Sequence, residues 1–198
     1  MIIAFTGHRP QKLGGYKDTP IKQWIREQLK SSLPKYAHQL FELNENCGLP
    51  KDDPLVFRSG GALGFDQIAA WEVGLLKKTY PDIILEMFLP HPDYGENWNA
   101  QSRMHLKYLC HSFADKVYYC SDEYLGPGTM FKRNRDMIRG AHVLIACWDG
   151  SGGGTKNTIE EAIKKIDVVR LNPKTKSTSV IRSTKAIHEG RVKQGRMF

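Results

Sequence analysis

Three glycine-rich segments of the sequence have the residue types and spacing to hold a phosphate-bearing ligand. The richest, residues 151–154, lies between an apolar run at 143–148 and a helical pattern that begins at Thr155. A strand, a glycine loop and a helix start in that order form a phosphate cradle, because glycine lets the backbone approach the ligand and free amides of the first helical turn attract an anion. A turn that holds nothing is the alternative, but three consecutive glycines before a threonine exceed what a turn needs.

Two further segments repeat this arrangement. Residues 6–10, Thr-Gly-His-Arg-Pro, and residues 58–66 each follow a short apolar run. Arg9 carries the planar guanidinium that suits a phosphate or carboxylate. Asp66 stands in the first turn of the next helix, where its charge suits the helix dipole and its oxygens suit a ribose hydroxyl. An exposed turn with an incidental arginine and a plain helix-start acid are the alternatives.

The elements that position these loops alternate between strand and helix patterns. Short apolar runs predict strands, and apolar residues at spacings of three and four predict helices. The predicted strands cover residues 1–5, 55–57, 83–89, 116–120, 143–148 and 168–171, and the predicted helices cover 19–43 with a break at Pro34, the segment after 66, 99–112, 130–140 and the segment from 155. This order predicts an α/β fold, a Rossmann-like three-layer sandwich with a mostly parallel sheet of about five or more strands. Its ligand loops belong at the carboxyl ends of the strands.

Length and composition set the outer bounds. A chain of 198 residues with ordinary apolar, aromatic and charged fractions is typical of one soluble α/β domain. No apolar run reaches the length of a membrane span, and the N-terminal segment lacks the order of a signal peptide. The four cysteines show no CxxC spacing, which favours reduced thiols over disulfides or a zinc site. We therefore expect a cytoplasmic protein with no membrane partner and no bound metal.

The net charge of +8 is concentrated at the C-terminal end. Lys and Arg are dense over residues 170–198, where Glu189 is the only acidic residue, so the rest of the chain is near neutral. We expect a ligand-binding domain over residues 1–171 and a basic C-terminal extension over 172–198. A basic extension is weak support for nucleic acid, and a solvated or subunit-clasping segment is an equal alternative.

Four motifs stand in a fixed order along the chain: TGHRP, SGGALGFD, MFKRNRDMI and WDGSGGGTKNTIEEA. Together they resemble the SLOG superfamily, and within it the YpsA-like branch, over residues 1 to about 171. The resemblance implies a Rossmann-like domain that binds a nucleotide or a nucleotide-derived small molecule, and it favours a homo-oligomer. We expect no cofactor. It implies that these residues face the ligand: Gly7, His8, Arg9, Ser59, Gly60, Gly61, Asp66, Arg133, Asn134, Gly153, Gly154, Thr155 and Thr158.

One departure from the wider superfamily bears on catalysis. The related Lonely Guy branch cleaves the N-glycosidic bond of nucleoside monophosphates and carries a PGGxGTxxE loop. Here Thr158 stands where that loop has its glutamate, and no proline precedes the glycines. An oxocarbenium-like transition state needs a nearby carboxylate, which threonine does not supply. If the chain is an enzyme, its candidate catalytic residues are Asp66, Arg133 and Glu160.

Three functions follow from these observations. The first is a binding or sensing module for a nucleotide-derived molecule, which the glycine loops and the missing glutamate favour. The second is a nucleotide N-glycosidase of the Lonely Guy type. The third is a single-stranded nucleic-acid binder like the related DprA proteins, supported by the basic extension and by Lys132, Arg133 and Arg135. The near-neutral body of the chain weighs against the third function.

Overall fold

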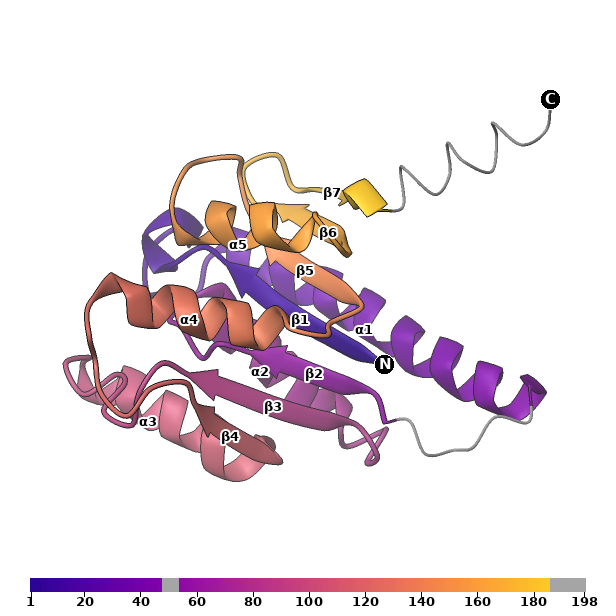
Figure 1. Ribbon diagram of the computed structural model, residues 1–198, viewed down its shortest axis with the longest axis horizontal. Coiled ribbons are helices and arrows are strands. Elements are labelled where there is room, and N and C mark those ends of the chain that lie inside the picture. Colours follow the sequence, from indigo (N-terminus) through magenta and orange to yellow (C-terminus); the bar gives the residue numbers. More distant parts are fainter. Residues whose placement is uncertain (48–53, 186–198) are drawn as a thin grey trace.

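The computed structural model describes residues 1–47 and 54–185, and of residues 40–47 it describes only the helical backbone. Within them the strands form one twisted sheet with the order β4-β3-β2-β1-β5-β6-β7 (Figure 1). The strands are β1 (Ile2–Gly7), β2 (Val56–Ser59), β3 (Ile84–Leu89), β4 (Lys116–Tyr119), β5 (Val143–Cys147), β6 (Asp167–Asn172) and β7 (Ser177–Ile181). Neighbouring strands are parallel except for β7, which runs antiparallel to β6.

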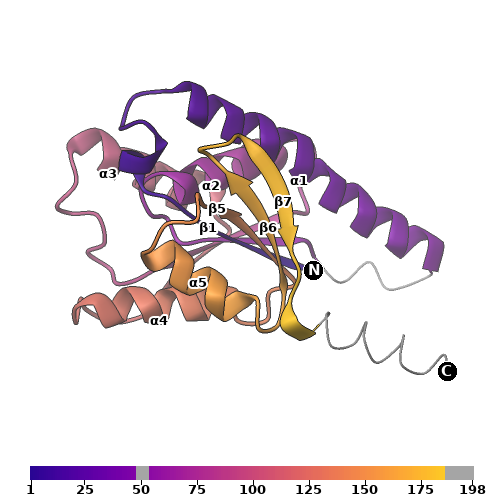
Figure 2. The ribbon, with the colours of Figure 1, turned by 90° about the horizontal axis from the view of Figure 1, so that it is seen from above.

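Helices cover both faces of the sheet, as Figure 2 shows from above. The elements α1, α2 and α3 lie on one face, and α4 and α5 lie on the other. Their bounds are α1 (Pro20–Cys47), α2 (Phe65–Leu76), α3 (Ala100–Tyr108), α4 (Pro127–Ile138) and α5 (Gly154–Ala162), with a 3₁₀ turn η1 (Pro10–Leu13) and a π-helical turn η2 (Leu109–Phe113). The predicted Rossmann-like three-layer sandwich is therefore confirmed. None of the described helices is long and apolar enough to cross a membrane.

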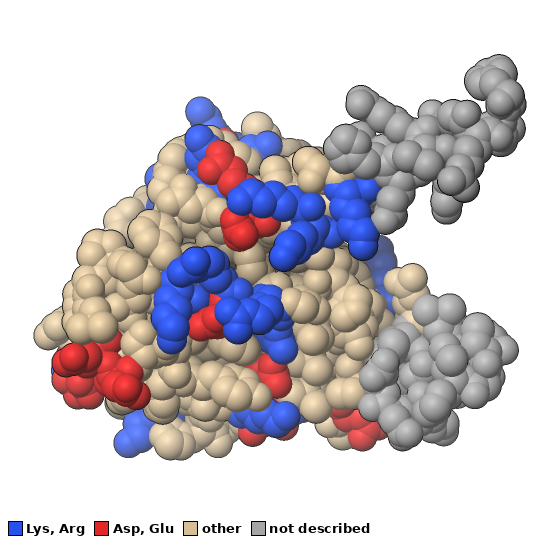
Figure 3. Space-filling view, in the orientation of Figure 1, with Lys and Arg blue, Asp and Glu red and all other residues tan. Residues whose placement is uncertain are grey.

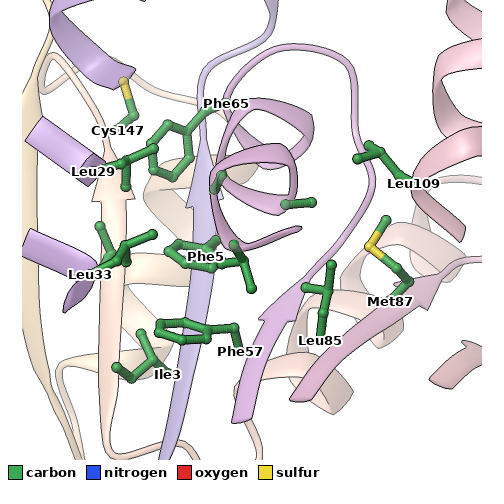
Figure 4. Packing of buried hydrophobic residues seen from close by; sticks show 14 of the residues in the cluster. Ile3, Phe5, Leu29, Leu33, Phe57, Phe65, Leu85, Met87, Leu109 and Cys147 are labelled. Carbon is green, nitrogen blue, oxygen red and sulfur yellow. The ribbon is translucent and has the colours of Figure 1, made fainter. Parts of the chain in front are cut away.

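Aromatic packing on the α1–α3 face is centred on β1 (Figure 4). The Phe5 ring stacks on Phe57 with centroids 5.7 Å apart and meets the edge of Phe65 at 6.2 Å. Leu29 and Leu33 from α1 cover this cluster, and all five side chains are fully or almost fully buried. Removing their apolar surface from water is the main force that holds α1 and α2 on the sheet.

The opposite face is packed by the intervening residues of the same strands. Ala4 of β1 and Ala146 of β5 point toward α4 and α5, where Met137 and Ile159 cover them. Because both faces of β5 are buried, its sequence is a continuous apolar run rather than an alternating one.

The strand order reverses between β1 and β5, which makes this the topological switch point of the sheet. Gly7 at the end of β1 pairs in register with Cys147 at the end of β5. In open α/β sheets ligands bind in the crevice outside the carboxyl ends of the strands at such a point. The segments that follow Gly7 and Cys147 are the first and third glycine-rich segments.

Two features of the fold differ from the sequence prediction. α1 continues through Pro34 as one helix, because Leu33 and Ala37 on either side of it are buried against the core and hold the helix together. The sheet also extends beyond residue 171, since β6 ends at Asn172 and β7 adds an edge strand. The extension expected from residue 172 therefore begins inside the sheet, and residues 186–198 lie outside the described part of the chain.

Candidate functional site

The carboxyl edge of the sheet brings the three glycine-rich segments into contact. The amide of Phe65 donates to the carbonyl of His8 at 3.1 Å, which joins the second segment to the first. Gly64 has a φ of +99°, and a Cβ there would stand 2.4 Å from the same carbonyl, so only glycine allows this approach. The first segment meets the third through the side chains of His8 and Asp149.

His8 is buried and lies at the centre of the junction between β1 and β5. Its Nε2 is 2.7 Å from Oδ1 of Asp149 and also accepts a hydrogen bond from the Asp149 backbone amide at 3.0 Å, so both the side chain and the backbone of Asp149 contact this nitrogen. The same Asp149 oxygen accepts a hydrogen bond from the Ser151 amide at 2.9 Å and another from its hydroxyl, and Lys12 donates to that hydroxyl. The network fixes the start of the third glycine segment against the end of β1.

The titration behaviour of this network follows from its environment. Burial lowers the pKa of His8 and outweighs the opposing effect of Asp149, so the imidazole is uncharged at neutral pH. Desolvation works to raise the pKa of Asp149, but hydrogen bonds from Ser151 and His8 outweigh it and hold that pKa well below its usual range. The His8–Asp149 contact therefore joins an uncharged imidazole to a carboxylate.

A buried ion pair occupies the second segment. Nη1 of Arg133, from α4, lies 3.5 Å from Oδ2 of Asp66, from α2, and both side chains are almost fully buried. Arg133 lies directly on Gly60, where a Cβ would stand 1.4 Å from Nη1. Burial raises the pKa of Asp66, while Arg133, Arg9 and the amides of Ala62 and Gly7 oppose the rise. Neither Nε nor Nη1 of Arg133 has a hydrogen-bond partner among the described residues.

The remaining contacts of the second segment are internal. The Ser59 hydroxyl donates to the carbonyl of Asp66 at 2.8 Å and accepts from the amide of Gly61 at 3.3 Å. Gln67 closes the same turn through a hydrogen bond to the Gly61 carbonyl. Ser59, Gly60 and Gly61 are all buried. Their hydrogen bonds to Asp66 and Gln67 therefore hold the start of α2 against the end of β2.

The third segment is open to solvent. Gly152, Gly153 and Gly154 are exposed, and nothing lies within 4 Å of where their Cβ atoms would be. Gly153 has a φ of +123° and stands at the N-cap of α5, with no side chain bonded to the first turn of the helix. The first-turn amides of α5 are thus free of side-chain caps, beside half-buried Thr155.

Arg9 is the exposed cation of the first segment. Its Nη2 lies 3.4 Å from the hydroxyl of Tyr94 in the loop after β3. The Tyr94 ring in turn packs edge-on against Trp98 at 5.0 Å, so Trp98 has a packing role here. The guanidinium of Arg9 keeps most of its donors available at this edge.

Comparison with known proteins agrees with this fold. The model of the YspA SLOG family (YpsA) matches residues 3–175. The chain belongs to this SLOG family. It is 35% identical over 127 residues to the uncharacterized SPbeta prophage-derived protein YoqJ of Bacillus subtilis, which covers 59% of this chain and 74% of that protein. It is 29% identical over 166 residues to a UPF0398 protein of Bacillus thuringiensis, which covers 83% of each.

A solved structure shares the fold of this SLOG protein. DNA processing protein A from Helicobacter pylori, described for its single-stranded DNA binding mode, superposes with a TM-score of 0.52 at 20% sequence identity. The match covers 96% of this chain and 72% of that one. At this identity the likeness concerns the fold, and the SLOG membership of the chain rests on the family match.

Two residues expected to face the ligand join α4 to α5. The Asn134 amide donates to the Thr158 hydroxyl at 2.9 Å, and that hydroxyl donates to the carbonyl of Gly154 at 2.9 Å. Thr158 is buried, with 3% of its surface exposed. The position that carries glutamate in the Lonely Guy loop is therefore occupied here by a helix-to-helix contact.

Glu160, the third catalytic candidate, is separate from the other two. It is exposed on α5 and pairs with Lys156 at 3.4 Å, one helical turn away. In the described part of the chain no ion pair or hydrogen bond joins it to Asp66 or Arg133. The same part contains no group of three or more His, Cys, Asp or Glu side chains that could hold a metal ion.

Asp149 is the site residue that the sequence analysis missed. It follows the apolar run at 143–148 and connects His8 with Ser151 across the switch point. The available signal was the parallel topology itself, because the residue after β5 must lie beside the residue after β1 in a sheet of this order.

Proposed function

We propose that this protein binds a nucleotide or nucleotide-derived small molecule and holds its phosphate at the start of α5. The observation that carries the proposal is the openness of Gly152 and Gly154. Both have ordinary φ values and free space where a Cβ would be, so neither turn geometry nor packing requires glycine at these positions. A ligand that approaches the backbone closely does require it.

The electrostatics of this edge support an anionic ligand. The uncapped amides and the dipole of α5 favour negative charge at Gly153 and Gly154. Arg9 is the exposed arginine at the same edge, whereas Arg133 is buried in its pair with Asp66. In the proposed complex Arg9 neutralises phosphate, and the Arg133–Asp66 pair shapes the loop against which the sugar lies.

The test is a binding assay on a bulky substitution at the open glycine. Gly154→Leu fills the proposed phosphate site while keeping helical backbone angles, so we expect at least about a tenfold loss of affinity for any nucleotide that binds the wild type. Isothermal titration with AMP, ADP-ribose and cyclic AMP provides the measurement. Gly128→Leu is the matched control, because Gly128 also lies in open space with an ordinary φ near the start of a helix, α4.

Two outcomes of that assay would contradict the proposal. One is the absence of heat and of thermal stabilisation with all three compounds. The other is an unchanged affinity in Gly154→Leu when the variant is folded by circular dichroism.

Binding without hydrolysis is supported by the arrangement of the polar groups. Asp149 stands between His8 and Ser151, so the serine hydroxyl bonds to the carboxylate and not to the imidazole. That order leaves no base positioned to activate the serine as a nucleophile. Asp66 is paired and buried, which removes it as a base for water. We therefore expect that the wild type releases no adenine from AMP, which chromatography can measure.

A second candidate function is binding of single-stranded nucleic acid. Figure 3 shows Lys and Arg side chains gathered on the face of the molecule that α4 and α5 form. Lys132, Arg135 and Arg139 are exposed on or just after α4, although Asp136 pairs with two of them. The fold shared with DNA processing protein A is consistent with this function.

Salt dependence separates this candidate from nucleotide binding. Phosphate contacts make affinity for single strands fall with log salt at a slope of about −0.7 per contact. If Lys132→Gln or Arg135→Gln makes the slope less steep by about 0.7, which corresponds to one lost phosphate contact, the result supports nucleic-acid binding. An oligonucleotide that does not bind at 50–100 mM salt, roughly the range in which such contacts are strong, excludes it.

The homo-oligomer that the family resemblance favours is also a proposal. Exposed apolar side chains on α3, Met104 at 71% and Tyr108 at 48%, are its structural support. Light scattering coupled to size exclusion measures the mass directly, and Met104→Lys should lower it if this surface forms the contact.

A further inference from the structure

A cavity lies on the side of the sheet opposite the α4–α5 layer. It has a volume of about 640 Å³ and opens between η1 and the starts of α1, α2 and α3. This size falls within the range of small-molecule sites, about 300–1,000 Å³. Its lining includes Pro10 and Gly64 from the first two glycine-rich segments, but none of the residues expected to face the phosphate ligand.

One wall of the cavity is a preformed aromatic surface. Trp71 of α2 and His105 of α3 have ring centroids 5.3 Å apart with planes tilted by 33°. Tyr108 and Phe113 also pack against the indole, with ring centroids at 5.7 Å and 5.2 Å. Burial, followed by the nearby charge of Arg26, lowers the pKa of His105, so the imidazole is uncharged at neutral pH. A flat ring can pack on this surface without first ordering it.

The facing wall carries an excess of positive charge. Lys22 and Arg26 lie one turn apart on α1, and Asp18 precedes the helix. Lys22 is 6% exposed and its Nζ donates to the carbonyls of Gly15 at 2.5 Å and Lys17 at 2.6 Å, which leaves the third ammonium hydrogen unused by these bonds. Arg26 Nη1 pairs with the half-exposed Asp18 at 2.6 Å. Among the lining residues, two cations and one carboxylate give an excess of one positive charge.

We propose that this cavity binds a flat aromatic or heteroaromatic ring that carries one negative charge. The ring lies against Trp71, and the anion lies beside Arg26 and Lys22. The anionic group is a carboxylate or a phosphate, since both accept hydrogen bonds from these cations. The cavity shares no lining residue with the proposed phosphate site at α5, so the two sites can be tested separately.

The test uses the full chain and three probes of similar ring size. These are indole-3-acetate, 1-naphthyl phosphate and the uncharged indole-3-ethanol, each titrated by isothermal calorimetry. At least one anion should bind with a Kd below about 1 mM, and the alcohol should bind about tenfold more weakly than that anion. The anion that binds more tightly identifies the carboxylate or phosphate source.

Substitutions then locate the bound anion. Trp71→Leu and Arg26→Gln should each weaken it about tenfold, whereas Asp18→Asn should tighten it about threefold because the local charge rises by one. Arg103→Gln is the matched control, since Arg103 lies on α3 outside the cavity lining. Gly154→Leu should leave indole-3-acetate binding unchanged, which separates this cavity from the α5 site.

The inference is overturned if neither anion binds the wild type below this limit or if the alcohol binds as tightly as the anions. It is also overturned if Arg26→Gln, folded by circular dichroism, keeps the wild-type Kd. Because Arg26 is half-buried at the rim, this variant stays informative even if Trp71→Leu fails to fold.

Discussion

Nη1 of Arg133 lies 3.5 Å from Oδ2 of Asp66, which ties α4 to α2 across the carboxyl end of β2. The two helices belong to opposite faces of the sheet, so the pair is a direct link between the outer layers. Gly60 lies beneath the guanidinium and leaves the space that it occupies. Since both side chains are almost fully buried, their charges depend on each other for stabilisation.

Removing one member of this pair should cost more than removing both. Arg133→Met leaves the Asp66 carboxylate buried without its main partner, and we expect a loss of about 3 kcal/mol in the free energy of unfolding. Adding Asp66→Asn should recover about 1–2 kcal/mol of that loss. Urea unfolding of the two single variants and the double variant measures the coupling. Additive losses would show that the two side chains stabilise the fold independently.

A methyl group at position 60 should cost less stability when Arg133 is absent. In the wild type the Cβ of Gly60→Ala would overlap Nη1 at 1.4 Å, and the buried guanidinium can move only by leaving Asp66. We expect a loss of about 2–3 kcal/mol. In an Arg133→Ala background the same change should cost about half as much, since only the approach of this Cβ to Oδ2 of Asp66 at 2.8 Å remains. Urea midpoints of the four proteins test this, and an equal cost in both backgrounds would place the strain in the loop backbone.

The hydrophobic pattern was sufficient to predict the layered fold. The run at 143–148 became β5 at Val143–Cys147, and the alternation of strands and helices allowed few arrangements besides a parallel sheet. β7 escaped prediction because Ser177–Ile181 is mostly exposed and polar at the sheet edge. Such a strand is held by backbone pairing with β6, which leaves little hydrophobic pattern in the sequence.

The candidate site was predictable at the level of loops but not of partners. Parallel topology places the three glycine segments at one edge, as expected. The partner of His8 lies 141 residues away, and the partner of Asn134 is on another helix. A motif shows which residues belong together, but it does not show whether a hydroxyl such as that of Thr158 points to a ligand or to a neighbouring helix.

Stability should become less dependent on His8 as the pH falls. The pKa of His8 is lowered in the folded state, so the unfolded chain binds its proton more readily. The stability that the neutral imidazole contributes is present above the unfolded pKa of about 6.5 and is lost as the pH falls through the folded value. His8→Gln should therefore cost about 1 kcal/mol at pH 7.5 and less at pH 5.

Urea unfolding of wild type and His8→Gln at the two pH values measures this difference. His105 also has a lowered pKa, but it is present in both proteins and its effect cancels. The pKa of Asp149 is lowered, so this carboxylate titrates only at pH values below about 4. Asp149→Asn is therefore the control: its effect on stability should not change between pH 7.5 and pH 5 through titration of residue 149 itself. A His8→Gln cost that is equal at pH 7.5 and pH 5 would mean that His8 does not titrate with unfolding.

Introducing the glutamate of the Lonely Guy loop at position 158 should destabilise the protein without creating a hydrolase. Thr158 is buried and its hydroxyl bonds to Asn134 and to the Gly154 carbonyl. Thr158→Glu places a carboxylate in that space and should lower the free energy of unfolding by about 2–4 kcal/mol at pH 7. The loss should shrink at acidic pH, where the buried acid is neutral. Thr158→Ser keeps the hydroxyl and should cost only about 1 kcal/mol. Urea unfolding and an adenine-release assay with AMP check both parts, and a stable Thr158→Glu variant that releases adenine would show that position 158 faces the ligand.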